Sequence, residues 1–143
     1  MERKSKPAGY IEPMPKGQLR RIMKAFQKKG GQIIMNEAVD EHLKLQHSEG
    51  ATFDAQTILL RKNPGRAAVF EELIHSTQFR MGKNNGTPLS ILQNEIEAQE
   101  KLLRYANAYR LSENEIEQTK RALQSYQIEL ELLRKGDAKD EGI

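Results

Sequence analysis

The segment from residue 66 to residue 80 constrains the fold most, because it predicts a helix that is apolar on nearly every side. Residues four apart lie on one face of a helix, so Glu71 and His75 fall one above the other, with Glu72 beside them. Gln78 extends this polar strip. Carboxylates among so many apolar neighbours are costly unless they are paired, protonated or bound to a metal. The strip is therefore the first candidate for a functional site.

The next predicted helix carries a further carboxylate on an apolar face. Four of its residues follow one line at spacings of four, three and four: Ile91, Glu95, Ala98 and Leu102. Glu97, in contrast, lines up with Lys101 and Arg104, which is typical of a solvated face. A polar residue on a core face is the kind of local inconsistency expected at functional sites. Glu95 is therefore grouped with the polar strip of the preceding helix.

Periodicity and capping signals predict the order helix, strand, helix, strand and then three helices. The elements expected before the polar strip are helix 18–29, strand 32–35, helix 37–46 capped by Asn36, a turn-like connector at 47–51 and strand 52–62. The later helices are expected at 66–80, with Asn63 as the cap and Pro64 at the first helical position, then at 88–110, and from a capping box at Ser112 and Glu115 to Gly136. This order indicates an α+β domain with a small sheet followed by three helices.

The length of the chain, 143 residues, fits one domain. We expect that domain at residues 16–136, after an irregular, linker-like lead-in at 1–15 and before a disordered tail at 137–143. No run of about 18 apolar residues is present, so no membrane span is predicted. The first residues lack the apolar stretch of a signal peptide, which indicates a cytoplasmic protein or one delivered as part of a larger secreted protein.

Few residues are available to bind a metal. The chain has no cysteine, so a metal must be held by histidine, aspartate or glutamate. Two of the three histidines, His42 and His47, have no partners at ligand spacing and are expected at the surface or in packing. Three tyrosines at helical spacing in apolar stripes are expected to pack in the core: Tyr105, Tyr109 and Tyr126. His75 is the remaining histidine.

The polar strip resembles the active-site helix of zinc metallopeptidases. That helix reads His-Glu-x-x-His, whereas residues 71–75 read Glu-Glu-Leu-Ile-His, with Glu71 at the position of the first histidine. Residues 95–99, Glu-Ile-Glu-Ala-Gln, resemble the Glu-x-x-Ala-Asp segment of the gluzincin branch of that group. The resemblance covers roughly residues 52–110 and implies a minimal zincin-like core.

The resemblance implies a role for each side chain of the motif. His75 and Glu95 would bind the metal, and Glu71 would take the first ligand position. Glu72 would be the general base that takes a proton from water. The strand before the helix, at residues 57–62, would pair with an extended peptide substrate.

The resemblance also implies a divalent metal, with zinc as the first choice. A Glu/His/Glu ligand set suits manganese or iron better than a histidine-rich set does, so these remain alternatives. The wider chain, including the strand at residues 57–62 that runs into Pro64, Gly65 and Arg66, further resembles small toxin domains at the C-termini of bacterial polymorphic toxins and phage-associated proteins. Together with the metallopeptidase resemblance, this likeness implies an effector domain that hydrolyses a peptide or protein substrate, with an immunity protein as a possible partner.

Several other interpretations remain open. Glu71 and His75 fit an ordinary helix pair, with Glu95 in a buried hydrogen-bonded network. Glu72 and His75 match one half of a di-iron carboxylate site, whose other half is missing. Residues 1–30 carry nine Lys and Arg against two Glu, a net charge of +7. They suit a non-catalytic module on a degenerate zincin scaffold that contacts an anionic partner, including nucleic acid, or else a nuclease-type toxin.

Overall fold

The computed structural model describes residues 2–4 and 10–141, with the side chains of residues 10–136. The strands of the described residues are β1 (Glu2–Lys4), β2 (Gln32–Ile34), β3 (Ser48–Asp54) and β4 (Thr57–Leu60). The helices are α1 (Lys16–Lys28), α2 (Glu37–Leu45), α3 (Arg66–Arg80), α4 (Pro88–Arg104) and α5 (Glu113–Glu141). A small sheet packed against helices confirms the predicted α+β class.

The strands form one sheet in the order β1-β3-β4-β2. β3 and β4 are an antiparallel hairpin, whereas β2 pairs with β4 in parallel. β1 pairs antiparallel with the other edge of β3. β4 therefore has a neighbour on each side and offers no open edge to a peptide. The expectation that residues 57–62 pair with a substrate is wrong for this reason.

The hairpin also corrects two predicted elements. The connector expected at 47–51 and the single strand expected at 52–62 are instead β3 and β4, joined by a tight turn. In that turn, Oδ1 of Asp54 accepts a hydrogen bond from the backbone N–H of Gln56 at 2.8 Å. The first half of β3 is buried on both faces, so its residues do not alternate between apolar and polar. Periodicity alone could not reveal such a strand.

Different helices cover the two faces of the sheet, since successive strand side chains point to opposite sides. On the face covered by α2, a buried cluster consists of Leu43, Ala51 and Leu59. On the other face, α1 and α3 contribute to a larger cluster that includes Leu19, Ile58, Leu60 and Val69. The N-terminus of α2 is capped as predicted, because Oδ1 of Asn36 accepts from the N–H of Val39 at 2.8 Å.

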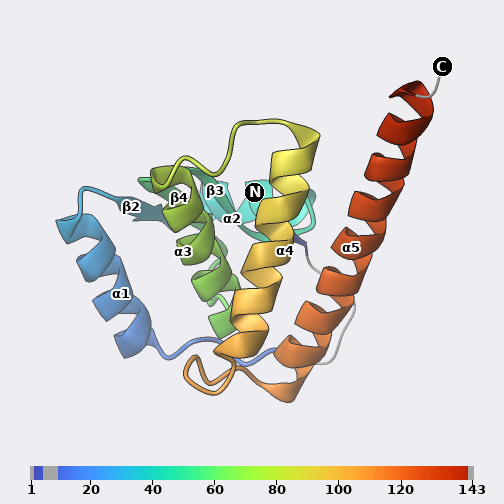
Figure 1. Ribbon diagram of the computed structural model, residues 1–143. Coiled ribbons are helices and arrows are strands. Elements are labelled where there is room, and N and C mark those ends of the chain that lie inside the picture. Colours follow the sequence, from blue (N-terminus) through green and yellow to red (C-terminus); the bar gives the residue numbers. More distant parts are fainter. Residues whose placement is uncertain (1, 5–9, 142–143) are drawn as a thin grey trace.

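α3 is the central helix of the domain. Figure 1 shows it between α1 and α4, with α5 on the outer side of α4. α3 contacts β3 and β4 as well as α4, and nine of its fifteen residues are buried. This position explains why its sequence is apolar nearly all the way round. Among the described residues, none of the helices combines the length and the apolar character needed to cross a membrane.

A residue from α5 holds the start of α3. The prediction that Asn63 caps this helix is wrong, because Asn63 takes a left-handed conformation with φ 54° and Gly65 is the cap residue. Oε2 of Glu115 accepts a hydrogen bond from the N–H of Ala67 at 2.6 Å. Its Oε1 accepts from the N–H of Ser112 at 3.1 Å, which confirms the predicted capping box. Glu115 therefore ties the first turns of α3 and α5 together.

The ends of α4 and α5 differ from the predictions. α4 ends at Arg104 rather than at Arg110, which takes a left-handed conformation with φ 56°. α5 continues through Gly136 to Glu141, so the predicted stop at the glycine is wrong. A single glycine costs a helix only about 1 kcal/mol and does not by itself end it. Residues 142–143 of the predicted tail lie outside the described residues.

The predicted lead-in at residues 1–15 is not irregular throughout. Residues 2–4 form β1. Met14 is buried, and its N–H donates to the carbonyl oxygen of Pro64 at 2.7 Å. Residue 1 and residues 5–9 lie outside the described part of the chain. Parts of the lead-in therefore pack with the domain.

Candidate metal centre

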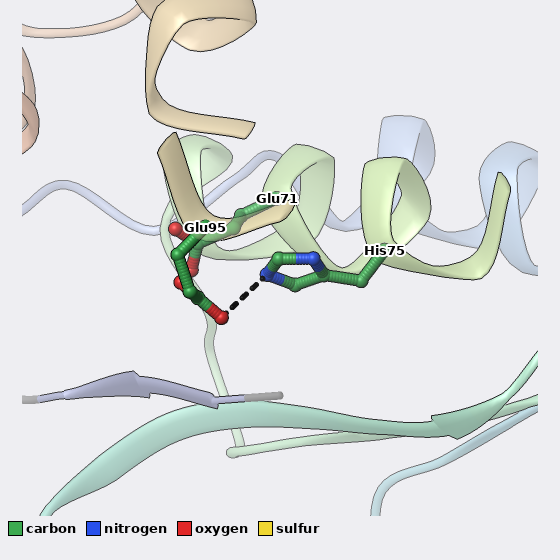
Figure 2. A group of neighbouring side chains, drawn as sticks. All are labelled: Glu71, His75 and Glu95. Carbon is green, nitrogen blue, oxygen red and sulfur yellow. Dashed lines mark ion pairs between the residues drawn. The ribbon is translucent and has the colours of Figure 1, made fainter. Parts of the chain in front are cut away.

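Three side chains from two helices converge in the interior of the protein. Glu71 and His75 extend from one face of α3, and Glu95 reaches them from α4, as Figure 2 shows. Each residue offers one ligand atom, and these atoms lie within 4.8 Å of one another. The exposed fractions are 1% for Glu71, 0% for His75 and 4% for Glu95. The fold thus brings together the three residues that the sequence predicts as ligands.

The hydrogen bonds of Gln78 define which nitrogen of His75 carries the proton. Nδ1 of His75 lies 2.8 Å from Oε1 of Gln78. Nε2 of Gln78 donates to the carbonyl oxygen of Asn94 at 2.9 Å and to Oε1 of Glu97 at 3.0 Å, which leaves its Oε1 to face the imidazole. An amide oxygen only accepts, so Nδ1 is the protonated nitrogen. Nε2 then faces Oε1 of Glu95 at a distance of 3.3 Å.

Burial also determines the charge of the imidazole. Burial lowers the pKa of His75 and outweighs the opposing effects of the Glu71 charge and the Gln78 hydrogen bond. A neutral imidazole with its proton on Nδ1 presents a lone pair at Nε2. This lone pair and a carboxylate oxygen of Glu95 are both acceptors. A cation between them would stabilise the arrangement.

Neutral side chains orient the two carboxylates. Gln99, four residues after Glu95 on α4, donates from its Nε2 to Oε1 of Glu71. Tyr126 on α5 hydrogen-bonds to Glu95. Burial, followed by the charges of the two carboxylates, raises the pKa of the Tyr126 hydroxyl, which stays protonated and acts as the donor. Donors of this kind position a carboxylate without removing its charge.

Glu72 lies beside this group and has its own partner. Its Oε1 accepts a hydrogen bond from Oγ1 of Thr52, on β3, at 2.8 Å. Its Oε2 is buried and has no hydrogen-bond partner among the described residues. Burial, and then the nearby charge of Glu71, raises the pKa of Glu72 well above its usual range. A carboxylate with a raised pKa is a stronger base than an ordinary carboxylate.

The donor set fits a divalent cation. Two carboxylates and one neutral imidazole are ligands for zinc, manganese and iron alike. Three protein ligands leave a coordination position for water or substrate. Burying a charged carboxylate costs on the order of several kcal/mol, and a cation bound between two such groups offsets part of that cost. The chemistry of the residues therefore supports a divalent metal at Glu71, His75 and Glu95.

Gln78 belongs to the predicted polar strip, but three other partners of these residues were not predicted from the sequence. Gln99 lies four residues after Glu95 on the same face of its helix, so its polar character on a core face was a usable signal. Tyr126 was expected only to pack, because its contact with Glu95 depends on how α5 lies against α4. Thr52 gave no signal, since a threonine in a strand is common. Each of the three acts through a contact between elements distant in the sequence.

The structure agrees with the predicted positions of His42, His47 and Tyr109 but not with that of Tyr105. His42 and His47 are exposed, as expected. Tyr109 packs against Phe70, with ring centroids 4.1 Å apart and planes 9° from parallel. Tyr105 is 44% exposed, so its predicted core position is wrong, because α4 ends before it.

Fold and site together define the class of this protein. A central helix carries the motif Glu-Glu-x-x-His, and with Glu95 on the next helix it forms a group that could hold a metal ion, in an arrangement that resembles the gluzincin type. The sequence model of the metallopeptidase toxin 4 family matches residues 6–129, and the chain belongs to that family. Neither the curated proteins nor the solved structures give a match to the chain.

Proposed function

We propose that this chain is a zinc-dependent peptidase that acts as a bacterial toxin or effector domain. The observation that carries the proposal is the buried ligand set, whose atoms lie within 4.8 Å of one another and include the lone pair of His75. Membership in a metallopeptidase toxin family supports a protein substrate. Manganese and iron are the alternatives to zinc, because two of the three ligands are carboxylates. An immunity protein in the producing cell is the expected partner.

The chemistry divides between the ligands and the base. Glu71, His75 and Glu95 would hold the metal, which when bound polarises a carbonyl group and lowers the pKa of water. Glu72 takes a proton from the attacking water and passes it to the leaving amine. Thr52 holds Oε1 of Glu72 in place, so the proton is exchanged at Oε2. The raised pKa of Glu72 makes its carboxylate a stronger base for the first of these steps.

The metal content of the purified protein tests the proposal. Wild-type protein isolated without chelator is expected to carry a stoichiometric amount of zinc, manganese or iron by elemental mass spectrometry. His75→Ala should lose that metal, because the imidazole is a ligand. His42→Ala removes an exposed histidine on α2 and should retain the metal. A wild-type protein that holds no metal, and that gains no thermal stability from any of the three ions, would refute the site.

The basic face of α1 favours a second candidate function. Five cationic residues of α1 are exposed: Lys16, Arg20, Arg21, Lys24 and Lys28. We infer that this face contacts an anionic partner, such as nucleic acid. Binding to nucleic acid that weakens steeply with salt, by a chain that holds no metal, would favour a non-catalytic module over a peptidase.

A further inference from the structure

The candidate metal centre is closed to a peptide. The four acidic and histidine side chains are each at most 4% exposed: Glu71, Glu72, His75 and Glu95. A peptidase must bring a peptide bond to such residues, so some element of the fold must move first. The elements that surround the centre differ in how firmly they are held.

β1 forms one edge of the sheet, beside β3. It pairs with β3 in the register Glu2–Ala51, Arg3–Gly50 and Lys4–Ser48. It also contacts α3, and in Figure 2 it is the pale violet strand drawn below the labelled side chains. Gly50, opposite Arg3, faces the proposed base, because a Cβ added to it would lie 3.0 Å from Cγ of Glu72. β1 therefore pairs with the part of β3 that faces Glu72.

We propose that β1 occupies the binding site for an extended peptide on β3, so that the chain covers its own metal centre until β1 is displaced. The inference rests on the proposed peptidase function. A peptide that binds at a sheet edge forms main-chain hydrogen bonds with the edge strand. The edge of β3 on the side of the centre is the one that β1 covers. β1 and a substrate peptide therefore compete for the same N–H and C=O groups.

β1 is also the surrounding element that is easiest to displace. It has three residues, and its pairing is irregular between Arg3 and Lys4. Opening the centre from the other side would instead separate α4 from α5, helices of 17 and 29 residues that pack together. Elements with few backbone hydrogen bonds open at the lowest free energy. Exchange of β1 for a peptide strand leaves the rest of the fold in place.

The same geometry defines the class of substrate. An extended segment held by main-chain hydrogen bonds is recognised through its backbone, with side chains alternating between the two sides. Gly50 has no side chain to hold the peptide away from Glu72. A flexible, extended segment of a protein fits this edge, whereas a folded helix does not.

An engineered disulfide between β1 and β3 tests the proposal directly. The chain has no cysteine, so Glu2→Cys with Ala51→Cys introduces one pair at facing positions. Ala51 packs with Leu43 on the face away from α3, so the bond avoids the centre. The oxidised double variant should cleave a flexible peptide at least about tenfold more slowly than the same protein after reduction. Equal rates before and after reduction would overturn the proposal, and the single-cysteine variants should not respond.

A pair of proline substitutions tests the effect of weakening the pairing between β1 and β3. Successive N–H groups of a strand point to opposite sides, so Arg3→Pro with Lys4→Pro removes whichever donor faces β3. Peptide cleavage should then rise about threefold to tenfold, because β1 is displaced more often. Arg3→Gln with Lys4→Gln removes the same charges but keeps both N–H groups, and it should leave the rate unchanged. A proline pair no faster than the glutamine pair would contradict the proposal.

The rate at which a chelator removes the bound metal tests the role of β1 independently of peptidase activity. The oxidised disulfide should slow the exchange and the proline pair should accelerate it. If these changes occur but no variant cleaves a peptide, β1 covers the centre and the proposed peptidase function fails. If peptide is cleaved but neither variant alters cleavage or exchange, the peptidase function stands and the role of β1 is wrong. A protein that binds no metal would overturn both.

Discussion

Carboxylates on the two faces of the sheet have pKa values that are shifted in opposite directions. On the face covered by α2, Asp40 accepts hydrogen bonds from Nε of Arg61 at 3.2 Å and from the backbone N–H of Lys62 at 2.9 Å. These bonds hold the pKa of Asp40 below its usual value. On the face covered by α3, Glu72 is buried beside Glu71, and its pKa is raised. One carboxylate is stabilised in its charged form, the other in its protonated form.

This difference in pKa distinguishes a structural ion pair from a candidate metal site. The pair at Asp40 is completed by a cation of the same chain, Arg61. The donors that orient the carboxylates at the centre are neutral: Gln99, Thr52 and Tyr126. These three donors carry no charge themselves, unlike Arg61. The interior set is therefore suited to a cation from solution, and strongly perturbed buried groups of this kind cluster at functional sites.

The largest expected effect is the loss of activity in Glu72→Gln. The amide keeps an oxygen that can accept from Thr52 but cannot take up a proton, so peptide hydrolysis should fall by about 10²- to 10⁴-fold. Metal content, measured on the same sample, should not change. Glu100→Gln is the control, since Glu100 is exposed on α4. An unchanged rate in Glu72→Gln would remove this residue from the mechanism.

A smaller effect is expected from the residue that orients Glu71. Gln99→Leu removes the donor to the Glu71 carboxylate and should weaken metal binding by about 10- to 100-fold, measured by competition with a chelator. The matched change Gln93→Leu lies on the exposed face of the same helix and should leave the affinity as it is. Equal affinities in the two variants would show that the hydrogen bond to Glu71 does not support a metal ligand.

The contrast between the faces also predicts opposite dependences of stability on pH in metal-free protein. The folded-state pKa of Glu72 is raised, so its stabilising contribution is present below the unfolded pKa and is lost as pH rises through the folded pKa. Glu72→Gln resembles the protonated form and should raise the free energy of unfolding at pH 8 by about 1–3 kcal/mol. At pH 4 the effect should be small. Urea titrations at both pH values measure it, and an equal gain at both would contradict the assignment.

The smallest effect is expected at Asp40, with the opposite sign. Its folded-state pKa is lowered, so its contribution is present above the unfolded pKa and is lost as pH falls through the folded pKa. Asp40→Asn should lower the free energy of unfolding at pH 7 by no more than about 1 kcal/mol, because the pair is near the surface. Near pH 2 the variant and the wild type should be equally stable. A loss that persists at that pH would indicate a packing role instead.

The ligand residues could be predicted because their signals are local. Glu71 and His75 are four apart on one helix, and Glu95 stands out on an apolar line of the next. Glu115 was predicted as part of a capping box for its own helix. Its second role, as acceptor for the N–H of Ala67, was not, since that bond joins residues 48 positions apart.

The sheet could be predicted only in part. The short strand β2 agrees with the prediction, whereas β3 was divided between a connector and a longer strand. β3 is covered on both faces, and its pattern carries no period to detect. The pairing of β1 with β3 joins residues nearly 50 positions apart and depends on the final arrangement of the sheet. We propose that the pairing of β1 with β3 controls access to the centre, and this pairing could not be predicted from sequence periodicity.

Anomalous X-ray diffraction from crystals grown without chelator tests the central claim most directly. Data collected on the two sides of the absorption edge of the bound metal locate that metal and identify it. The account predicts a single strong peak within coordination distance of His75 Nε2 and of one carboxylate oxygen each from Glu71 and Glu95. A metal-loaded protein whose peak lies elsewhere, or one with no peak at these residues, would contradict it.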